Sequence, residues 1–198
     1  MGFFEGGTIV DASLIAAPTS TKNQGKARDP DMHSRKKGNQ WFFGSKFRIG
    51  VDSKTGLVHT LKVTSGNVSD IAEAASLLHG DEQSAHGDAG YQGLDKRPGM
   101  LTDNPPVCVI AMRPGKLAEL TQDDCEETQQ LRHAARELAS RRAKVEHMFR
   151  DIKTRFGYAK NRYRGLVKDA AHLTFLTAIA NVLRGDAYER RSLIASEI

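Results

Sequence analysis

LRHAARELASRRAKVEHMFRDIKTRF, residues 131–156, is the stretch that decides the fold. Apolar side chains recur along it every seven residues, at Leu131, Leu138, Val145 and Ile152. A second row runs beside the first, at Ala135, Arg142, Phe149 and Phe156. Two adjacent rows with this period are typical of an amphipathic helix that buries one stripe. We therefore predict one long helix from Leu131 to Phe156, packed against a core.

Glu146 lies at the border of that stripe, directly after the apolar Val145. Arg142 precedes it by four residues and Lys153 follows it by seven, so the three charges share one helical face. A carboxylate between two cations at the edge of a core is expected of a metal and phosphate site. The alternative is an ordinary ion pair on a solvated face, which stabilises a helix by only about 0.2–0.5 kcal/mol. The helix alone favours the ion pair, so the rest of the chain has to decide.

The composition indicates a globular protein with a polyanionic partner. The 198 residues are enough for one sizeable core, and 39% of them are hydrophobic and 27% charged. The formal net charge is +5, and basic residues gather in two clusters, within residues 22–37 and 132–168. Such clusters favour nucleic acid as the partner, although a basic surface that serves only solubility is an open alternative.

The two cysteines, Cys108 and Cys125, lie far apart and outside any zinc-binding spacing. They indicate neither a zinc site nor a disulfide framework, and a reducing cytoplasm fits them. The N-terminus lacks the pattern of a signal peptide, and no apolar run approaches the ~20 residues needed to cross a membrane. We expect a cytoplasmic protein with one domain, residues 1–198.

An acid interrupts the first predicted strand. Thr8 to Ile15 is rich in β-branched and apolar residues, yet Asp11 lies in its middle. A carboxylate inside a buried strand is costly unless it is paired or binds a metal ion. The polar residues that follow, about 16–39, are predicted to form a mobile basic loop that carries Lys36 and Lys37.

A hairpin follows this loop, with strands at Trp41 to Asp52 and Leu57 to Thr64 and its turn at 52–56. The spacing of Lys46 and Arg48 puts both side chains on one face of the hairpin. Asp52 is expected to serve the turn.

A second acid follows a short strand. After a predicted helix from Ile71 to His79, capped by Ser69 or Asp70, the chain runs through a short strand into Asp88. The small residues and the aromatic of GDAGYQG, residues 87–93, suit a site that a phosphate backbone approaches closely, and a polar turn is the alternative.

The remaining elements complete a mixed pattern. We predict a buried strand at Pro105 to Met112, a polar connection at Leu117 to Gln130, a helix end at Gly157 and a last helix at Ala170 to Arg184. This order of strands and helices predicts an α/β fold with helices packed on a central sheet. Two acids on strands and a third on a later helix are what a two-metal site needs, and oxygen ligands favour Mg²⁺ or Mn²⁺.

Three segments resemble the motifs of the DDE transposases of bacterial insertion sequences: GTIVDASLI around Asp11, GDAGYQG around Asp88 and RAKVEHMFRDIK around Glu146. The helix signature of that superfamily is Tyr-x2-Arg-x3-Glu-x6-Lys, and Arg142, Glu146 and Lys153 match its last three members. Ala139 stands at the tyrosine position, so any DNA contact of that tyrosine is missing or supplied elsewhere.

The segments RDPDMHSRKKGNQWFFG, AMRPGK and KNRYRGL resemble, more narrowly, insertion-sequence family five of the family four/five superfamily. Members usually carry a helical DNA-recognition region before the first catalytic strand. Because this chain starts only a few residues before that strand, we expect the catalytic portion of a longer transposase, with that region absent.

The resemblance implies a ribonuclease H-like fold and metal-dependent cleavage and strand transfer at insertion-sequence ends. It implies that Asp11, Asp88 and Glu146 bind two divalent ions. The expected DNA-binding residues are Arg142, Lys153, Tyr91, Lys36, Lys37 and Lys46, with Tyr91 equally able to be a core aromatic. The expected partners are double-stranded DNA and, in the DNA complex, a second copy of the chain, at the bacterial nucleoid. A catalytically inactive DNA-binding remnant and a ribonuclease H-like nuclease of RNA–DNA hybrids are the alternatives.

Overall fold

A six-stranded mixed sheet forms the centre of the computed structural model, which describes residues 6–122 and 125–196, with side chains as far as Arg190. The strands are β1 Gly7–Ala16, β2 His33–Lys37, β3 Gln40–Asp52, β4 Val58–Ser65, β5 Ser84–Gly87 and β6 Val107–Ile110. Their order is β2-β3-β1-β5-β6, and β4 also pairs with β3. β1 runs antiparallel to β3 and parallel to β5, and β5 runs parallel to β6.

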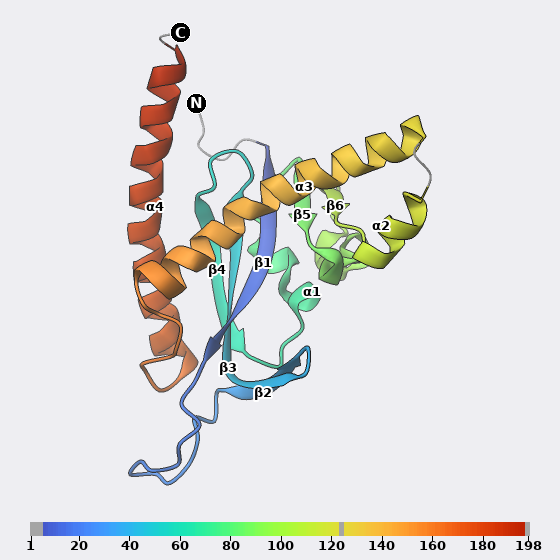
Figure 1. The fold of residues 1–198 in the computed structure, drawn as a ribbon. Helices are drawn as coiled ribbons and strands as arrows, with labels where there is room; N and C mark the ends of the chain where they lie inside the picture. Colours follow the sequence, from blue (N-terminus) through green and yellow to red (C-terminus); the bar gives the residue numbers. More distant parts are fainter. Residues whose placement is uncertain (1–5, 123–124, 197–198) are drawn as a thin grey trace.

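The helices are α1 Asp70–Glu73, α2 Pro114–Leu120, α3 Glu126–Arg150 and α4 Leu166–Ser196. Short 3₁₀ turns lie at η1 Ala75–Leu77, η2 Ala89–Tyr91, η3 Leu94–Lys96 and η4 Pro98–Met100, and one π-helical turn, η5 Asp151–Arg155, follows α3. Figure 1 shows α3 crossing one face of the sheet and α4 alongside β4. A mixed sheet flanked by helices confirms the predicted α/β class and is consistent with a ribonuclease H-like fold.

Alternation along β1 divides the core between the two faces of the sheet. Ile9 belongs to the cluster under α3 and α4, which also contains Phe47 of β3 and Phe149 of α3, whose rings meet edge to face with centroids 5.7 Å apart. Val10 belongs to the opposite cluster, together with Leu77 and other residues of the short turns. Both faces of the sheet are therefore covered. The side chains of β1 that share the face of Ile9 are the ones directed toward α3.

The hairpin forms where it was predicted. Asp52 ends β3, and its carboxylate accepts hydrogen bonds from the backbone N–H groups of Lys54 and Thr55. The Gly56 N–H donates to the Asp52 carbonyl, and φ of Gly56 is +76°, a value that favours glycine. The assignment of Asp52 to the turn is confirmed.

The long helix differs from its prediction at both ends. It begins at Glu126, five residues before Leu131, and its regular part ends at Arg150. In the π turn that follows, the Phe156 N–H donates to the Asp151 carbonyl at 2.9 Å. This wider turn keeps Ile152 fully buried while Asp151 pairs with Arg184 of α4. Gly157, with φ +67°, then ends the helix as predicted.

Four other predictions of local structure need correction. Residues 16–39 are not one loop, because residues 33–37 form β2 and pair with β3. The helix predicted from Ile71 to His79 is broken into α1 and η1. Residues 105–112 hold an edge strand whose Val107 is 67% exposed, so this strand is not buried. The connection at 117–130 contains the end of α2 and the start of α3.

The last helix, α4, is longer than its predicted range of 170–184. Its segment Leu166–Arg190 contains an 18-residue window with a mean hydropathy of 1.3 and by length and composition alone could cross a membrane. The helix nevertheless packs Leu173 and Leu176 into the core, and Asn181 exchanges hydrogen bonds with the backbone of Val58 in β4. One such helix does not make the chain a membrane protein.

Candidate active site

Two aspartates follow the same register just beyond the paired residues of two neighbouring parallel strands, β1 and β5. In the β1–β5 pair, Gly7 lies opposite Ser84 and Ile9 opposite His86, an offset of 77 residues. The same offset relates Asp11 to Asp88, two positions beyond the last paired residues. Because parallel strands place equivalent positions side by side, both carboxylates lie at the same end of the β1–β5 ladder.

Asp11 is the more buried of the two, with its side chain 19% exposed. Its Oδ1 accepts a hydrogen bond from the Ala12 N–H at 2.7 Å, and Arg142 Nη2 lies 4.0 Å from its Oδ2. Burial raises the pKa of Asp11 from 3.8 to about 6, against the Ala12 hydrogen bond, and the negative charge of Asp88 raises it further. Burial therefore disfavours the ionised form of Asp11, which a bound cation would stabilise.

Asp88 begins the 3₁₀ turn η2, where its Oδ1 accepts a hydrogen bond from the Gly90 N–H at 2.8 Å. The turn packs closely against the end of β5: a Cβ on Gly87 would lie 3.0 Å from the Cβ of Tyr91, so glycine is needed there. The small residues around Asp88 thus allow close packing against a tyrosine of the same chain, and the approach of a phosphate backbone stays a prediction.

Tyr91 lies beneath the aspartates and is 2% exposed. Its burial and the nearby charges of Asp11, Asp70 and Asp88 raise the pKa of its hydroxyl group. A ring in this position cannot stack on a nucleobase without leaving the core. Of the two roles considered for Tyr91, the structure supports the core aromatic, and the prediction that it contacts DNA is corrected.

The helix α3 passes over β1. Glu146 lies along the chain between two cations, Arg142 and Lys153, that each approach a residue of β1. Arg142 approaches Asp11, and Lys153 Nζ donates to Ser13 Oγ at 2.6 Å. Asp11 and Ser13 are two residues apart and so point to the same face of β1. Glu146 shares the helical face of Arg142 and Lys153 and is exposed, and within the described residues no hydrogen bond or ion pair holds its carboxylate.

The exposed position of Glu146 differs from the prediction of a site packed against the core. Its neighbours Val145 and Met148 are buried, so the helix is fixed while the carboxylate projects from the edge of the contact. A carboxylate without an internal partner on a fixed helix is available to a ligand. The metal-binding roles of Asp11, Asp88 and Glu146 stay predictions.

Lys153 belongs to a basic surface that continues onto β2. Burial lowers the pKa of Lys153, and the nearby positive charge of Lys37 lowers it further. Lys37 and Lys36 lie in the exposed outer strand β2, where Lys36 is paired with Trp41 of β3 and the Trp41 side chain is 68% exposed. Three lysines thus lie on elements that adjoin the end of β1.

Lys46 does not belong to this surface. Its side chain is 3% exposed, and its Nζ donates to Asp70 Oδ1 and to the Val68 carbonyl, both at 2.7 Å. Arg48, which shares its face of β3, also pairs with Asp70, at 3.2 Å. The common face of the two cations is confirmed, but it points inward, so the prediction that Lys46 contacts DNA is corrected.

Ser69 is the N-cap of α1, one of the two residues predicted for that position. Asp70 follows it, and its carboxylate pairs with Lys46, Arg48 and Arg35, a role that the sequence did not predict. The alternating cations of β3 were the available signal, because two buried cations on one face require an anion. Nothing in the local pattern shows which anion it is.

Comparison with known proteins agrees with this arrangement. A family model described as "Transposase DDE domain" matches residues 2–182. No solved structure matches the chain. The matched range contains every residue of the site, from Asp11 on β1 to Lys153 after α3.

Proposed function

The chain belongs to the transposase DDE domain family, and from this premise we propose that it catalyses DNA transposition, cutting double-stranded DNA at insertion-sequence ends and joining the cut strands to a target. One observation carries this proposal. Asp11 and Asp88 follow one register just beyond the last paired residues of β1 and β5, beside the helix that carries Glu146. We place the element in insertion-sequence family five, on the segments that resemble that family.

Transposases of this family generally use divalent metal ions. The donors fit such ions: carboxylates are hard oxygen ligands, and burial, which raises the pKa of Asp11, opposes a negative charge that a bound cation would stabilise. We propose Asp11, Asp88 and Glu146 as ligands of two Mg²⁺ or Mn²⁺ ions. When bound, such ions activate a water molecule or a 3′-hydroxyl group and stabilise the leaving oxygen.

The protein residues around these carboxylates would bind and orient the DNA. Arg142 and Lys153 are placed beside Asp11 and Ser13, where they can hold the phosphates next to the scissile bond. Lys36 and Lys37 would extend the contact along the backbone from β2. We propose a dimer in the DNA complex, because two transposon ends have to be brought together, and a location at the nucleoid.

Glu146→Gln tests the catalytic role. It removes the charge of an exposed carboxylate that no internal contact holds, so the variant should fold and bind DNA within about twofold of the parent. Nicking of a supercoiled plasmid in Mg²⁺ or Mn²⁺ should fall at least about 100-fold, since catalysis by bound metal ions depends on their ligands. Glu137→Gln, on an exposed position of the same helix, is the matched control and should nick like the parent.

Two results would contradict the proposal in different ways. A parent that binds plasmid but never nicks it would be a DNA-binding remnant without turnover. Equal nicking by Glu146→Gln and the parent would remove Glu146 from the site. Preferred cleavage of RNA–DNA hybrids over duplex DNA would favour the ribonuclease reading.

Mg²⁺ titration by calorimetry tests the aspartates without DNA. The parent should bind Mg²⁺ saturably, and Asp88→Asn should weaken binding at least tenfold, because one of two adjacent carboxylates is lost. Asp186→Asn, which alters an exposed ion pair on α4, should bind as the parent does. Binding that is unchanged in Asp88→Asn would place the ions elsewhere.

A further inference from the structure

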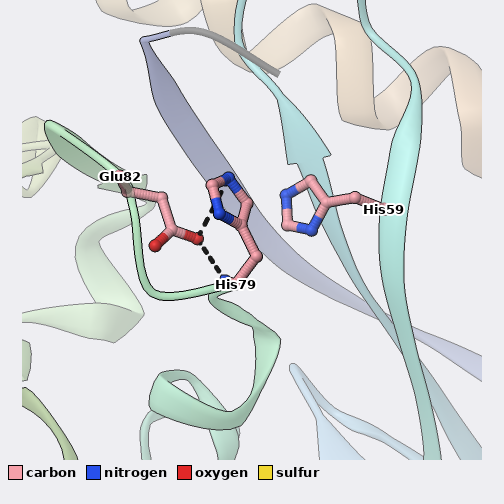
Figure 2. Close-up of side chains that lie close together, drawn as sticks. All are labelled: His59, His79 and Glu82. Atoms are coloured by element: carbon pink, nitrogen blue, oxygen red, sulfur yellow. Dashed lines mark hydrogen bonds and ion pairs between the residues drawn. The ribbon is translucent and has the colours of Figure 1, made fainter. Parts of the chain in front are cut away.

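Two imidazoles and a carboxylate converge at the opposite end of the β1–β5 pair. His59 lies on β4, and His79 and Glu82 lie on the segment between η1 and β5 (Figure 2). Their candidate ligand atoms all lie within 4.8 Å of one another. The two rings meet edge to face with centroids 4.8 Å apart, and Figure 2 shows the His79 ring between the Glu82 carboxylate and the His59 ring.

Glu82 is the reason to look for a cation here. Its side chain is 1% exposed, and its carboxylate accepts hydrogen bonds from the backbone N–H groups of His79 and Gly80. Burial opposes its ionisation, but these donors outweigh burial and lower the pKa of Glu82. Among the described residues no lysine or arginine pairs with it, and its ion-pair partner is His79, with His79 Nε2 3.7 Å from Glu82 Oε1. Buried carboxylates are paired with cations or bind metal ions.

His59 is oriented as a metal ligand. Its Nδ1 lies 2.8 Å from Thr60 Oγ1, which directs Nε2 toward the cluster. Thr8 Oγ1 donates to Glu82 Oε1 at 3.1 Å and accepts from that Nε2 at 2.9 Å, so the hydroxyl group links the imidazole to the carboxylate, and a bound ion would take its place on Nε2.

We propose that His59, His79 and Glu82 form a zinc site, with a water molecule as the fourth ligand, that is separate from the carboxylate site. Two imidazoles and one carboxylate suit Zn²⁺ better than Mg²⁺, which prefers oxygen ligands. Tetrahedral coordination needs ligand atoms about 3.3 Å apart, and His79, exposed on a loop, can close the present spacing. The site uses neither cysteine, so the spacing of Cys108 and Cys125 gave no sign of it.

The ion would fasten the segment 78–83 to the sheet. It would join β4 to the residues that lead into β5, and β5 in turn ends at Gly87, directly before Asp88. Thr8 and Asp11 are three residues apart on β1, so the zinc site and the carboxylate site lie at successive levels of the same strands. The proposed role is to hold the strand that positions Asp88, without any part in the chemistry.

Zn²⁺ competition with a chromophoric chelator, on the full chain, measures this site directly. The parent should bind one Zn²⁺ per chain with high affinity, and Co²⁺ in its place should give the intense visible absorption of four-coordinate geometry. His79→Gln removes an exposed ligand and should weaken Zn²⁺ binding at least about 100-fold, more than the loss of an outer-shell contact. His133→Gln, which removes an exposed imidazole of α3, is the matched control and should bind as the parent does.

A second pair of variants keeps the test decisive. His59→Asn removes the ligand on the sheet, so it should lose Zn²⁺ even if His79→Gln disturbs the loop. Asp88→Asn should keep the high-affinity Zn²⁺ while it loses Mg²⁺. High-affinity Zn²⁺ that disappears in Asp88→Asn and survives in both histidine variants would overturn the proposal, as would a folded parent that binds no Zn²⁺. Neither result bears on plasmid nicking, which tests the transposase function separately.

Discussion

Asp11 and Asp70 are similarly shielded carboxylates with opposite surroundings. Their side chains are 19% and 26% exposed. Asp70 contacts Lys46 at 2.7 Å, Arg48 at 3.2 Å and Arg35 at 3.5 Å. Asp11 has one guanidinium group, of Arg142, at 4.0 Å, and the negative charge of Asp88 nearby. Asp70 has more positive charge around it than its carboxylate can neutralise, whereas Asp11 has too little positive charge around it.

This difference separates structure from function within one sheet. The cluster around Asp70 ties β3 to the start of α1, and it requires all its members because two of its cations are buried. The pair formed by Asp11 and Asp88 is incomplete within the chain, since burial disfavours the charge that Asp11 would carry. Two carboxylates that lack sufficient positive charge around them, held in place at the end of the β1–β5 pairing, are what a cation site requires.

Removing Asp70 should have the largest effect on stability. Asp70→Asn leaves Lys46 and Arg48 buried without an anion, and breaking such a group costs about 3–5 kcal/mol in the free energy of unfolding. Urea unfolding followed by circular dichroism measures the loss. Asp186→Asn breaks an exposed ion pair with Arg190 and should change the free energy of unfolding by less than about 1 kcal/mol. Equal losses in the two variants would remove the contrast on which the comparison rests.

Asp11→Asn should act in the opposite direction. The folded protein raises the pKa of Asp11 from 3.8 to about 6, so the stability that the protonated form contributes is complete below pH 3.8 and is lost as pH rises through 6. At pH 7 the loss is about 2–3 kcal/mol, from the size of the shift. The asparagine variant should escape it and be more stable than the parent at pH 7.

The measurement is the free energy of unfolding of both proteins between pH 4 and 8, without divalent ions. The difference between the two curves isolates Asp11 from the other groups that titrate in this range. Mg²⁺ should then stabilise the parent at pH 8 and leave Asp11→Asn nearly unchanged, if it binds at this carboxylate. Parallel curves would mean that the charge of Asp11 is neutralised in the folded chain.

The sequence predicted the strands and the helix of the site better than the contacts that its residues make with distant parts of the chain. The strand at Asp11, the short strand before Asp88 and the helix at Glu146 each follow from a local pattern of apolar residues, which sets the side that is buried. The family signature then linked them. The strand β2 was missed because its five residues, His33–Lys37, are polar and largely exposed at the outside of the sheet.

The partners depend on contacts between distant segments, which no local pattern encodes. Asp70 has the position of a helix cap in the sequence, and only the fold brings it to the cations of β3. His59 and Glu82 are 23 residues apart and belong to no spacing motif. The π turn after Arg150 continues the apolar period of the helix, so its wider winding leaves no trace in the sequence.

The smallest expected effect is on DNA binding, through Lys37. This lysine is exposed on β2, in contrast to the buried Lys46 of the neighbouring strand β3. Lys37 lies on β2 beside Lys153 and has no carboxylate partner among the described residues, whereas Lys46 is held by Asp70. Lys37→Ala should lower the slope of log affinity for duplex DNA against log salt concentration by about 0.9, the contribution of one phosphate. Binding at 0.1 M salt should weaken no more than about tenfold.

Lys54→Ala, on the turn of the hairpin, should leave the slope unchanged, because Lys54 lies at the other end of β3 from the basic surface. A slope lowered equally by both changes would mean that DNA binds to the net charge of the chain, and not to a surface built around the uncompensated lysines.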